Sequence, residues 1–145
     1  MIGFLLKLFM KGKKLGHLFD AEAGYQCFPD APKKVRKPDV SFIRRGRLPA
    51  DRPPTGHIMI PPDLAVEVAS PHDKVYEIET KIVEYLSAGV RLIWIVYPGT
   101  RRVRVLRPAG SPAGSGQELT EDEMITVKEM LSGFACKVAD CFADD

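Results

Sequence analysis

Hydrophobic residues near the middle of the chain predict a buried strand, a helix and a second buried strand. Residues 63–69 (DLAVEVA) and 90–98 (VRLIWIVYP) are short apolar runs, typical of strands that are covered on both faces. Ser70 followed by Pro71 resembles a helix N-cap with proline at the first helical position. The apolar stripe of this helix consists of Val75, Ile78, Ile82, Tyr85, Leu86 and Ala88. A unit of this length predicts a right-handed crossover between two parallel strands.

Shorter elements are expected around this unit. The N-terminal stretch has a helical apolar face, made up of Ile2, Leu5, Leu6, Phe9 and Met10. Apolar and β-branched runs predict strands at 24–28, 38–43 and 124–127. In RRVRVLRP (101–108), valine alternates with arginine, which predicts a strand with one face exposed to solvent. The pattern therefore predicts an α/β fold, with a mixed sheet of about five strands and helices on its faces.

The length of 145 residues predicts a single domain over 1–145. Within it, residues 1–19 form an N-terminal helix and linker, and residues 108–117 form a flexible loop rich in glycine, serine and proline. Residues 44–62 are rich in proline, glycine and arginine and have no clear period. A loop that long in a compact domain is usually functional or disordered.

Charge is distributed unevenly along the chain, although the formal net charge is only +2. Residues 1–52 carry 12 Lys or Arg against 5 Asp or Glu, whereas residues 118–145 carry 2 against 8. A basic first third suits a phosphate-rich partner such as DNA. The alternative is an unevenly charged, solvated surface.

Three cysteines, Cys27, Cys136 and Cys141, form no CxxC pair and have no histidine at ligand spacing. An odd number without a zinc pattern predicts free thiols and a cytoplasmic protein. The N-terminal apolar stretch is interrupted by Lys7 and is too short to span a bilayer. We therefore expect a helix that packs on the core and no membrane partner, with a membrane-surface helix as the alternative.

The residue that most needs an explanation is Glu67, a carboxylate in an otherwise apolar strand. Burying it is costly unless something compensates its charge. Asp39 begins the preceding predicted strand, and Lys81 lies at the edge of the helical stripe. Adjacent strands lie about 4.8 Å apart, so two carboxylates on them can share one Mg²⁺ or Mn²⁺ ion. Such a metal activates water, while a lysine orients that water or stabilises a developing oxyanion.

Each of these residues also has a plain structural interpretation. Asp39 fits a turn or strand start, Lys81 fits a surface lysine whose stem is buried, and Glu67 fits an ion pair with Lys81 or an arginine. Ser70 and His72 directly follow the acidic strand and could line a site, although Ser70 also fits a helix cap. Candidate phosphate contacts, or simply a solvated loop, are Arg44, Arg45, Arg47 and Arg52.

Several segments, in this order, closely resemble the Uma-two family of bacterial restriction endonucleases. These segments are KPDVSFI (37–43), PPDLAVEVASPHDK (61–74), KIVEYLSAGVRLIWIVYP (81–98) and LSGFACKVADCF (131–142). The family belongs to the PD-(D/E)XK nuclease superfamily, and the resemblance covers roughly residues 20 to 142. It implies a restriction-endonuclease-like fold and Mg²⁺-dependent phosphodiester hydrolysis. On this pattern, Asp39 and Glu67 are the metal ligands and Lys81 is the catalytic lysine.

The chain departs from the superfamily pattern at two points. The lysine that normally stands two residues after the acid is replaced by Ala69, and Lys81 on the following helix is the matching position in this family. Many members carry another acid on the first helix, which has none here, and Glu22 is the nearest substitute.

The sequence therefore predicts a metal-dependent DNA endonuclease, expected to be a homodimer because nucleases that cut two strands are often dimers. One alternative is a structure-selective nuclease such as a Holliday-junction resolvase. Another is a catalytically silent nuclease fold that serves as a binding or assembly module. A third is a protein held at a membrane surface by residues 1–14.

Overall fold

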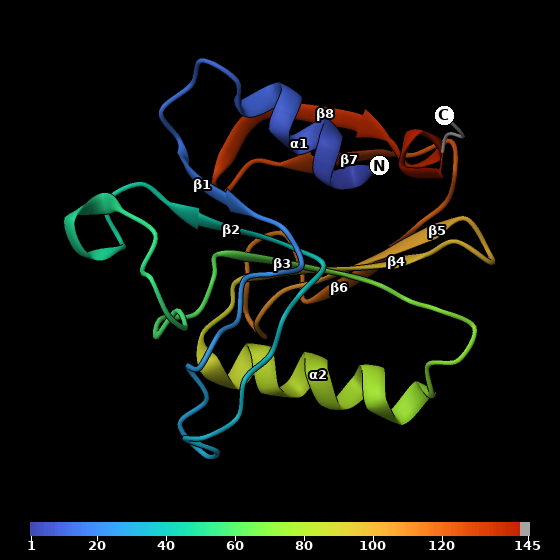
Figure 1. The fold of residues 1–145 in the computed structure, drawn as a ribbon. Helices are drawn as coiled ribbons and strands as arrows, with labels where there is room; N and C mark the ends of the chain where they lie inside the picture. The colour runs from blue at the N-terminus through green and yellow to red at the C-terminus, as the bar shows by residue number, and fades with distance from the viewer. Residues whose placement is uncertain (143–145) are drawn as a thin grey trace.

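The computed structural model describes residues 1–142, which fold into a six-stranded sheet, a two-stranded sheet and two α-helices (Figure 1). The elements are α1 (Ile2–Met10), β1 (Gly16–Phe19), β2 (Val40–Arg44), η1 (Pro49–Asp51), β3 (Leu64–Val68), α2 (Val75–Ala88), β4 (Leu92–Tyr97), β5 (Arg102–Leu106), β6 (Gly116–Leu119), β7 (Met124–Val127), β8 (Leu131–Lys137) and η2 (Val138–Phe142). The predicted α/β class with a mixed sheet is confirmed.

The large sheet has the strand order β1-β2-β3-β4-β5-β6. Strands β3 and β4 are parallel and are connected through α2, and the other neighbouring pairs are antiparallel. The predicted crossover between two parallel strands is therefore present. Within the large sheet, strand β4 is buried from Leu92 to Val96. This burial explains why the segment is apolar at every position.

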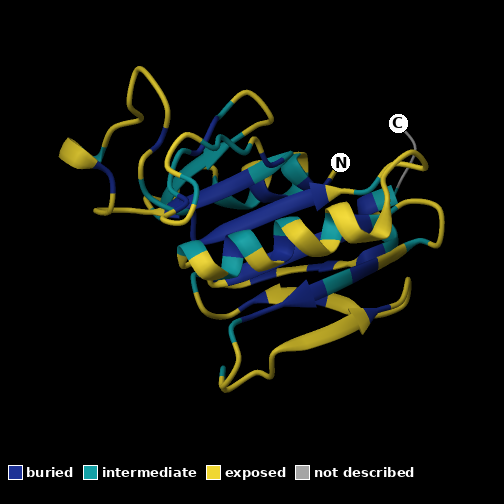
Figure 2. Ribbon diagram, turned by 90° about the horizontal axis from the view of Figure 1, so that it is seen from below, coloured by how far each residue is buried: buried dark blue, intermediate teal, exposed yellow. Residues whose placement is uncertain are grey.

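Two different layers cover the two faces of this sheet (Figure 1). Helix α2 packs on one face, where Ile82 and Tyr85 meet Ala65 and Ile93. Helix α1 and the β7–β8 sheet pack on the other face. Figure 2 shows the resulting pattern on α2, which is exposed on its outer side and lies over buried strands. Because successive strand residues face opposite sides, the two cores take alternate residues of β3 and β4.

Helix α1 forms as predicted, and its apolar stripe packs on the core. Ile2 and Leu6 are buried, and Leu5, Phe9 and Met10 pack against the same cluster. The opposite side of the helix is also apolar but lies open to solvent: Phe4 is 62% exposed and Leu8 is 59% exposed. No helix within residues 1–142 combines the length and apolarity needed to cross a bilayer.

The prediction of a strand at 24–28 is wrong, and the first strand is instead β1, inside the expected linker. Tyr25 makes two isolated backbone bridges, to Arg36 and to Ile58, and no ladder extends from them. Pro29 follows directly and lacks the N–H that a longer ladder would need. Tyr25 is nevertheless fully buried, and its hydroxyl lies 2.6 Å from Oγ of Ser41.

Helix α2 begins at Val75, four residues later than the Ser70–Pro71 pattern predicted. The intervening residues form a turn in which the Ser70 N–H donates to Oδ2 of Asp73 at 2.8 Å. The Asp73 N–H donates back to the carbonyl oxygen of Ser70 at 3.0 Å. Ser70 therefore closes a turn instead of capping the helix.

One more boundary differs from the prediction, and one further strand was not predicted. Strand β6 begins at Gly116, within the expected flexible loop 108–117, and it adds a sixth strand to the sheet. The C-terminal segment contains strand β8, which pairs with β7 in a separate small sheet.

All three cysteines are free thiols, and burial raises the pKa of Cys27 to about 11.

Candidate active site

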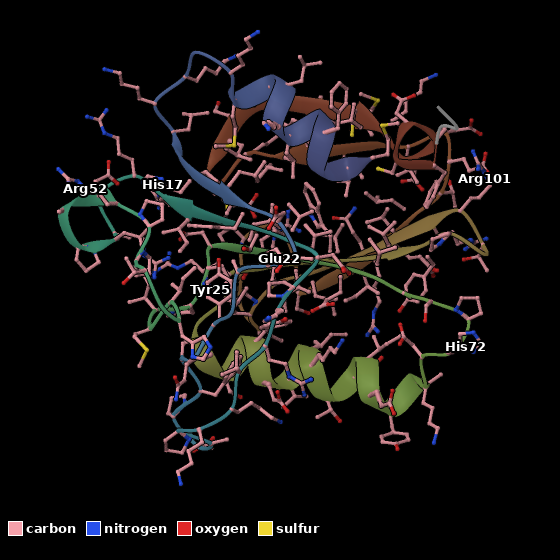
Figure 3. The ribbon with its side chains drawn as sticks, in the orientation of Figure 1. His17, Glu22, Tyr25, Arg52, His72 and Arg101 are labelled. Carbon is pink, nitrogen blue, oxygen red and sulfur yellow. The ribbon has the colours of Figure 1, made fainter. Side chains whose placement is uncertain are left out.

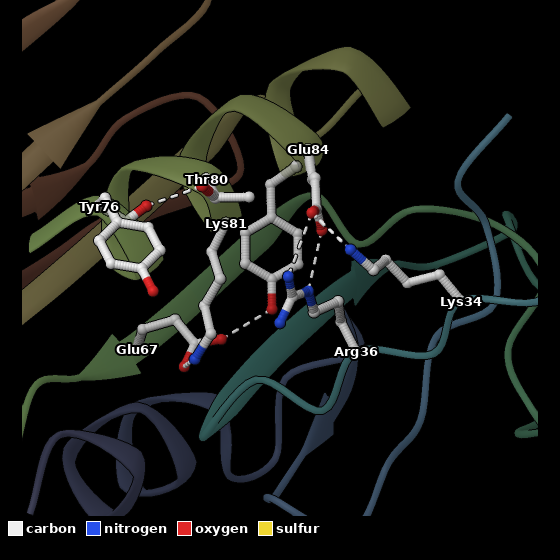
Figure 4. A network of polar contacts seen from close by, with 8 residues as sticks. Lys34, Arg36, Glu67, Tyr76, Thr80, Lys81 and Glu84 are labelled. Atoms are coloured by element: carbon white, nitrogen blue, oxygen red, sulfur yellow. Dashed lines mark hydrogen bonds and ion pairs between the residues drawn. The ribbon is translucent and has the colours of Figure 1, made fainter. Parts of the chain in front are cut away.

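Glu67 lies on the α2 side of β3 and is only 9% exposed. The hydroxyl of Tyr85 donates a hydrogen bond to Oε1 of Glu67 at 2.7 Å. The ammonium group of Lys81 lies 3.6 Å from the other oxygen, Oε2 (Figure 4). The buried carboxylate is thus compensated by one neutral donor and one cation, and the ion pair considered from sequence is present.

The local sequence explains why these three groups meet. Alternation along β3 turns Ala65 and Glu67 toward α2. Lys81 and Tyr85 are four residues apart, so they lie one turn apart on the same side of the helix. The crossover places this side of α2 over β3 and β4.

Asp39 immediately precedes β2 and lies opposite Glu67. Val40 pairs with Val66 in the antiparallel β2–β3 ladder, so continuing the register by one residue sets Asp39 against Glu67. Directly opposed residues have Cβ atoms about 4.5–5.5 Å apart and side chains on the same face. The Val68 N–H donates to Oδ2 of Asp39 at 2.7 Å, which anchors the second carboxylate beside the first.

The surroundings of Glu67 act on its proton affinity in opposite directions. Burial raises the pKa of the Glu67 carboxyl group, and the nearby negative charge of Asp39 raises it further. The hydrogen bond from Tyr85 and the charge of Lys81 oppose this increase. Burial and the Glu67 carboxylate also raise the pKa of Tyr85, so its hydroxyl remains a donor. A cation between Asp39 and Glu67 would favour the ionised pair.

A second ionic cluster adjoins this site (Figure 4). Glu84 of α2 accepts from Arg36 at 2.9 and 3.1 Å and from Lys34 at 2.6 Å. These bonds lower the pKa of the Glu84 carboxyl group. Because Lys34 and Arg36 belong to the segment that leads into Asp39, the cluster ties that segment to α2.

The donor set of this pair of carboxylates fits Mg²⁺ or Mn²⁺. Mg²⁺ is commonly bound by one or two carboxylates and completes its coordination with water. Among the hydrogen bonds of residues 1–142, none engages Oδ1 of Asp39, which leaves that oxygen for a cation. Across the same residues, no group of three or more His, Cys, Asp or Glu side chains is suited to a metal. A cation here would therefore rely on Asp39, Glu67 and water.

All three predicted accessory residues are exposed and lie outside the helices and strands. Ser70 and His72 are exposed in the turn between β3 and α2. Glu22 is exposed in the turn after β1, where its N–H donates to Oδ1 of Asp20. Within the described part of the chain, no side-chain bond links Glu22 to Asp39 or Glu67. The prediction that these residues assist catalysis stays a prediction.

The four predicted arginine contacts lie at the other end of β2. Arg44 is five residues from Asp39, which corresponds to about 17 Å along a strand. Figure 3 shows Arg52 at one end of the molecule and His72 at the other. Arg47 is 2.8 Å from the buried Asp63, and Arg45 is 3.9 Å from Asp51.

Sequence reasoning missed the polar role of Tyr85 and the Arg36–Glu84 pair. Tyr85 belongs to the apolar stripe of the helix, and its ring packs there as predicted. Glu84 lies three residues after Lys81, on the side of the helix that faces the site. That spacing is the only signal for Glu84, and nothing in the sequence indicates its partner 48 residues earlier.

Comparisons with known proteins concern the family and the fold of the chain. The model of the Uma2 family, described as "Putative restriction endonuclease", matches residues 2–139. The fold resembles a crystal structure described as "a putative nuclease belonging to DUF820 from Anabaena variabilis", with a TM-score of 0.78 and 21% identity. The match covers 97% of this chain and 75% of that chain, and at this identity it concerns the fold alone. A search of curated proteins finds no match.

Proposed function

Because the chain belongs to the Uma2 family of restriction-endonuclease-like proteins, we propose that it is a metal-dependent endonuclease that hydrolyses phosphodiester bonds in DNA. The observation that carries the proposal is the position of Asp39 opposite Glu67, one residue beyond the end of the β2–β3 ladder, with Lys81 3.6 Å from Glu67. The fold, the acidic pair and the adjacent lysine together support this reaction better than any other.

Asp39 and Glu67 are the residues that would hold Mg²⁺ or Mn²⁺. When bound there, the cation would supply an activated water and neutralise charge on a phosphoryl oxygen. Lys81 stands beside Glu67, where its ammonium group can orient the attacking water or stabilise the developing oxyanion. Tyr85 and the Val68 N–H each bind one carboxylate oxygen, and so keep Glu67 and Asp39 in place.

Incubation with supercoiled plasmid in Mg²⁺ or Mn²⁺ tests this proposal. The wild type should convert the plasmid to nicked and linear forms, and EDTA should stop the reaction. Asp39→Asn and Glu67→Gln should each abolish cleavage, whereas Glu118→Gln, an exposed position on β6, should leave it intact. Cleavage that persists unchanged in both site variants would refute the site.

A binding or assembly module without catalysis is the second candidate function. The specific observation in its favour is the Lys81–Glu67 ion pair, which compensates the buried carboxylate without any metal. Calorimetry separates the two candidates, because a silent module binds DNA but shows no heat of Mn²⁺ binding. A preference for four-way junctions over linear duplex would instead identify a junction resolvase.

We further propose that the chain acts as one domain over 1–145, as a homodimer in the cytoplasm. A dimer would supply two sites for the two strands of a duplex. Light scattering of the purified protein should give twice the 16.1 kDa mass of the chain. A mass of one chain at micromolar concentration would contradict this part of the proposal.

A further inference from the structure

Two basic loops that are far apart in the sequence lie side by side at one end of the large sheet. Gly16 of β1 pairs with Arg44 of β2, so the loop that enters β1 adjoins the loop that leaves β2. The Arg45 N–H donates to the carbonyl oxygen of Leu15 at 3.0 Å, which joins the two loops directly. Figure 1 shows both loops at the same end of the β1–β2 pair.

These loops form a basic surface that is exposed to solvent. We call it the basic loop surface, and its residues are Lys11, Lys13, Lys14, Arg44, Arg45 and Arg52. The single acid in segments 11–15 and 44–52 is Asp51, which accepts from the Gly46 N–H and contacts His17. Arg47 is not included, because it compensates the buried Asp63.

Most of these cations are available to an external anion. Among residues 1–142, Lys11, Lys14, Arg44 and Arg52 form no ion pair with an acidic side chain. The side chain of Arg45 is 61% exposed and lies 3.9 Å from Asp51, a long contact that a phosphate can replace. Lys13 donates to the carbonyl oxygen of Phe9 at the end of α1 and keeps its charge at the surface.

The composition of the two loops indicates which anion they fit. Proteins that hold single-stranded nucleic acid usually stack bases on aromatic side chains. Segments 11–15 and 44–52 contain no aromatic residue, so they offer charge and hydrogen-bond donors but no stacking surface. Contacts of that kind engage the phosphates of a duplex without reading its sequence.

The basic loop surface is too far from Asp39 to contact the same phosphate. Arg44 stands about 17 Å from Asp39 along β2. Successive phosphates of one strand are separated by about 3.4 Å along the duplex axis, so this distance spans about five base pairs. A duplex aligned with β2 would reach both places at once.

We propose that the basic loop surface anchors duplex DNA through sequence-independent phosphate contacts, about five base pairs from the phosphate that faces Asp39 and Glu67. The position of cleavage rests on the proposed function, whereas the binding of DNA at the basic loop surface does not. The basic loop surface increases the affinity for DNA, and the Asp39–Glu67 pair carries out the chemical step.

Fluorescence anisotropy with a labelled 30-base-pair duplex, in EDTA and at a series of KCl concentrations, tests the anchor. The variant is Lys14→Gln/Arg52→Gln. The matched control is Lys128→Gln/Lys137→Gln, which changes an exposed lysine in the turn between β7 and β8 and an exposed lysine at the end of β8. The slope of log K against log[KCl] should decrease in magnitude by about 2 in the variant and remain unchanged in the control. Equal slopes in wild type and variant would overturn the proposal.

Two further measurements, of DNA cleavage and of vesicle binding, distinguish a failure of the anchor from a failure of the proposed function. If the wild type cleaves DNA, the variant should raise KM with an unchanged single-turnover rate at saturating duplex. If the wild type binds duplex but does not cleave it, the proposed function fails while the anchor stands. Binding to anionic vesicles, such as phosphatidylserine in phosphatidylcholine, without binding to duplex would overturn the anchor.

Discussion

Beneath α2, the hydroxyl of Tyr85 donates to Oε1 of Glu67 at 2.7 Å. This bond occupies one carboxylate oxygen and leaves Oε2 facing Lys81, 3.6 Å away. The tyrosine ring is fully buried and packs beside Phe28, with ring centroids 6.2 Å apart. One residue of the helix thus supports the core with its ring and orients a site carboxylate with its hydroxyl.

Replacing Tyr85 by phenylalanine should reveal this second role. The ring remains, but a buried carboxylate oxygen loses its donor, so the free energy of unfolding should fall by about 1–2 kcal/mol. Mn²⁺ affinity should fall as well, because Glu67 is no longer held in one orientation. Chemical denaturation and calorimetry measure the two effects. Tyr76→Phe, on the same helix and 65% exposed, is the control and should change neither quantity.

Lys81 should be needed for the reaction and not for holding the metal. Lys81→Met removes the cation beside Glu67, and the single-turnover cleavage rate should fall by about 10²–10³-fold, the usual effect of losing one electrostatic stabiliser. Mn²⁺ binding should persist, because the two carboxylates remain. An unchanged cleavage rate would show that Lys81 serves only as the counter-ion of Glu67.

The Glu84 cluster should make stability depend on pH in a defined direction. Its bonds with Arg36 and Lys34 lower the pKa of Glu84 below the ordinary value of 4.5. A lowered carboxyl pKa stabilises the fold above the pKa of the unfolded chain, and this contribution is lost as pH falls through the folded pKa. Glu84→Gln should therefore cost about 1–2 kcal/mol at pH 7. The difference from wild type should shrink below about pH 4.5, and a constant difference from pH 7 to pH 3 would contradict this account.

The two sides of α1 should respond differently to truncation. Leu6 is fully buried, and Leu6→Ala should lower the free energy of unfolding by about 2–4 kcal/mol, in the range for buried leucines. Leu8 is 59% exposed, and the same substitution there should change stability by less than about 0.5 kcal/mol. Denaturant titration of both variants measures the contrast. Equal losses would mean that another surface covers Leu8 in solution.

The central unit of the fold could be predicted because its signals are local. β3 and β4 are apolar runs of strand length, and the stripe of α2 has a helical period. β1 could not be predicted in the same way, because GHLF is short and contains one polar residue and a glycine. Its strand conformation comes from pairing with β2, a contact between segments about 25 residues apart.

The individual residues of the candidate site could be predicted, but their arrangement in space could not. Asp39, Glu67 and Lys81 are identifiable one by one, but the position of Asp39 opposite Glu67 depends on the β2–β3 register, which the sequence does not fix. The same register explains why the arginines of the long loop lie away from the carboxylates. Arg44 is at the far end of the strand that begins beside Asp39.

The central claim is that Asp39 and Glu67 together hold the divalent cation of a nuclease. Anomalous diffraction from a crystal soaked in Mn²⁺ tests it most directly. We expect an anomalous peak within coordination distance of both carboxylates. If this position stays empty in a crystal soaked at a saturating Mn²⁺ concentration, with Glu67 still paired to Lys81, the claim is contradicted.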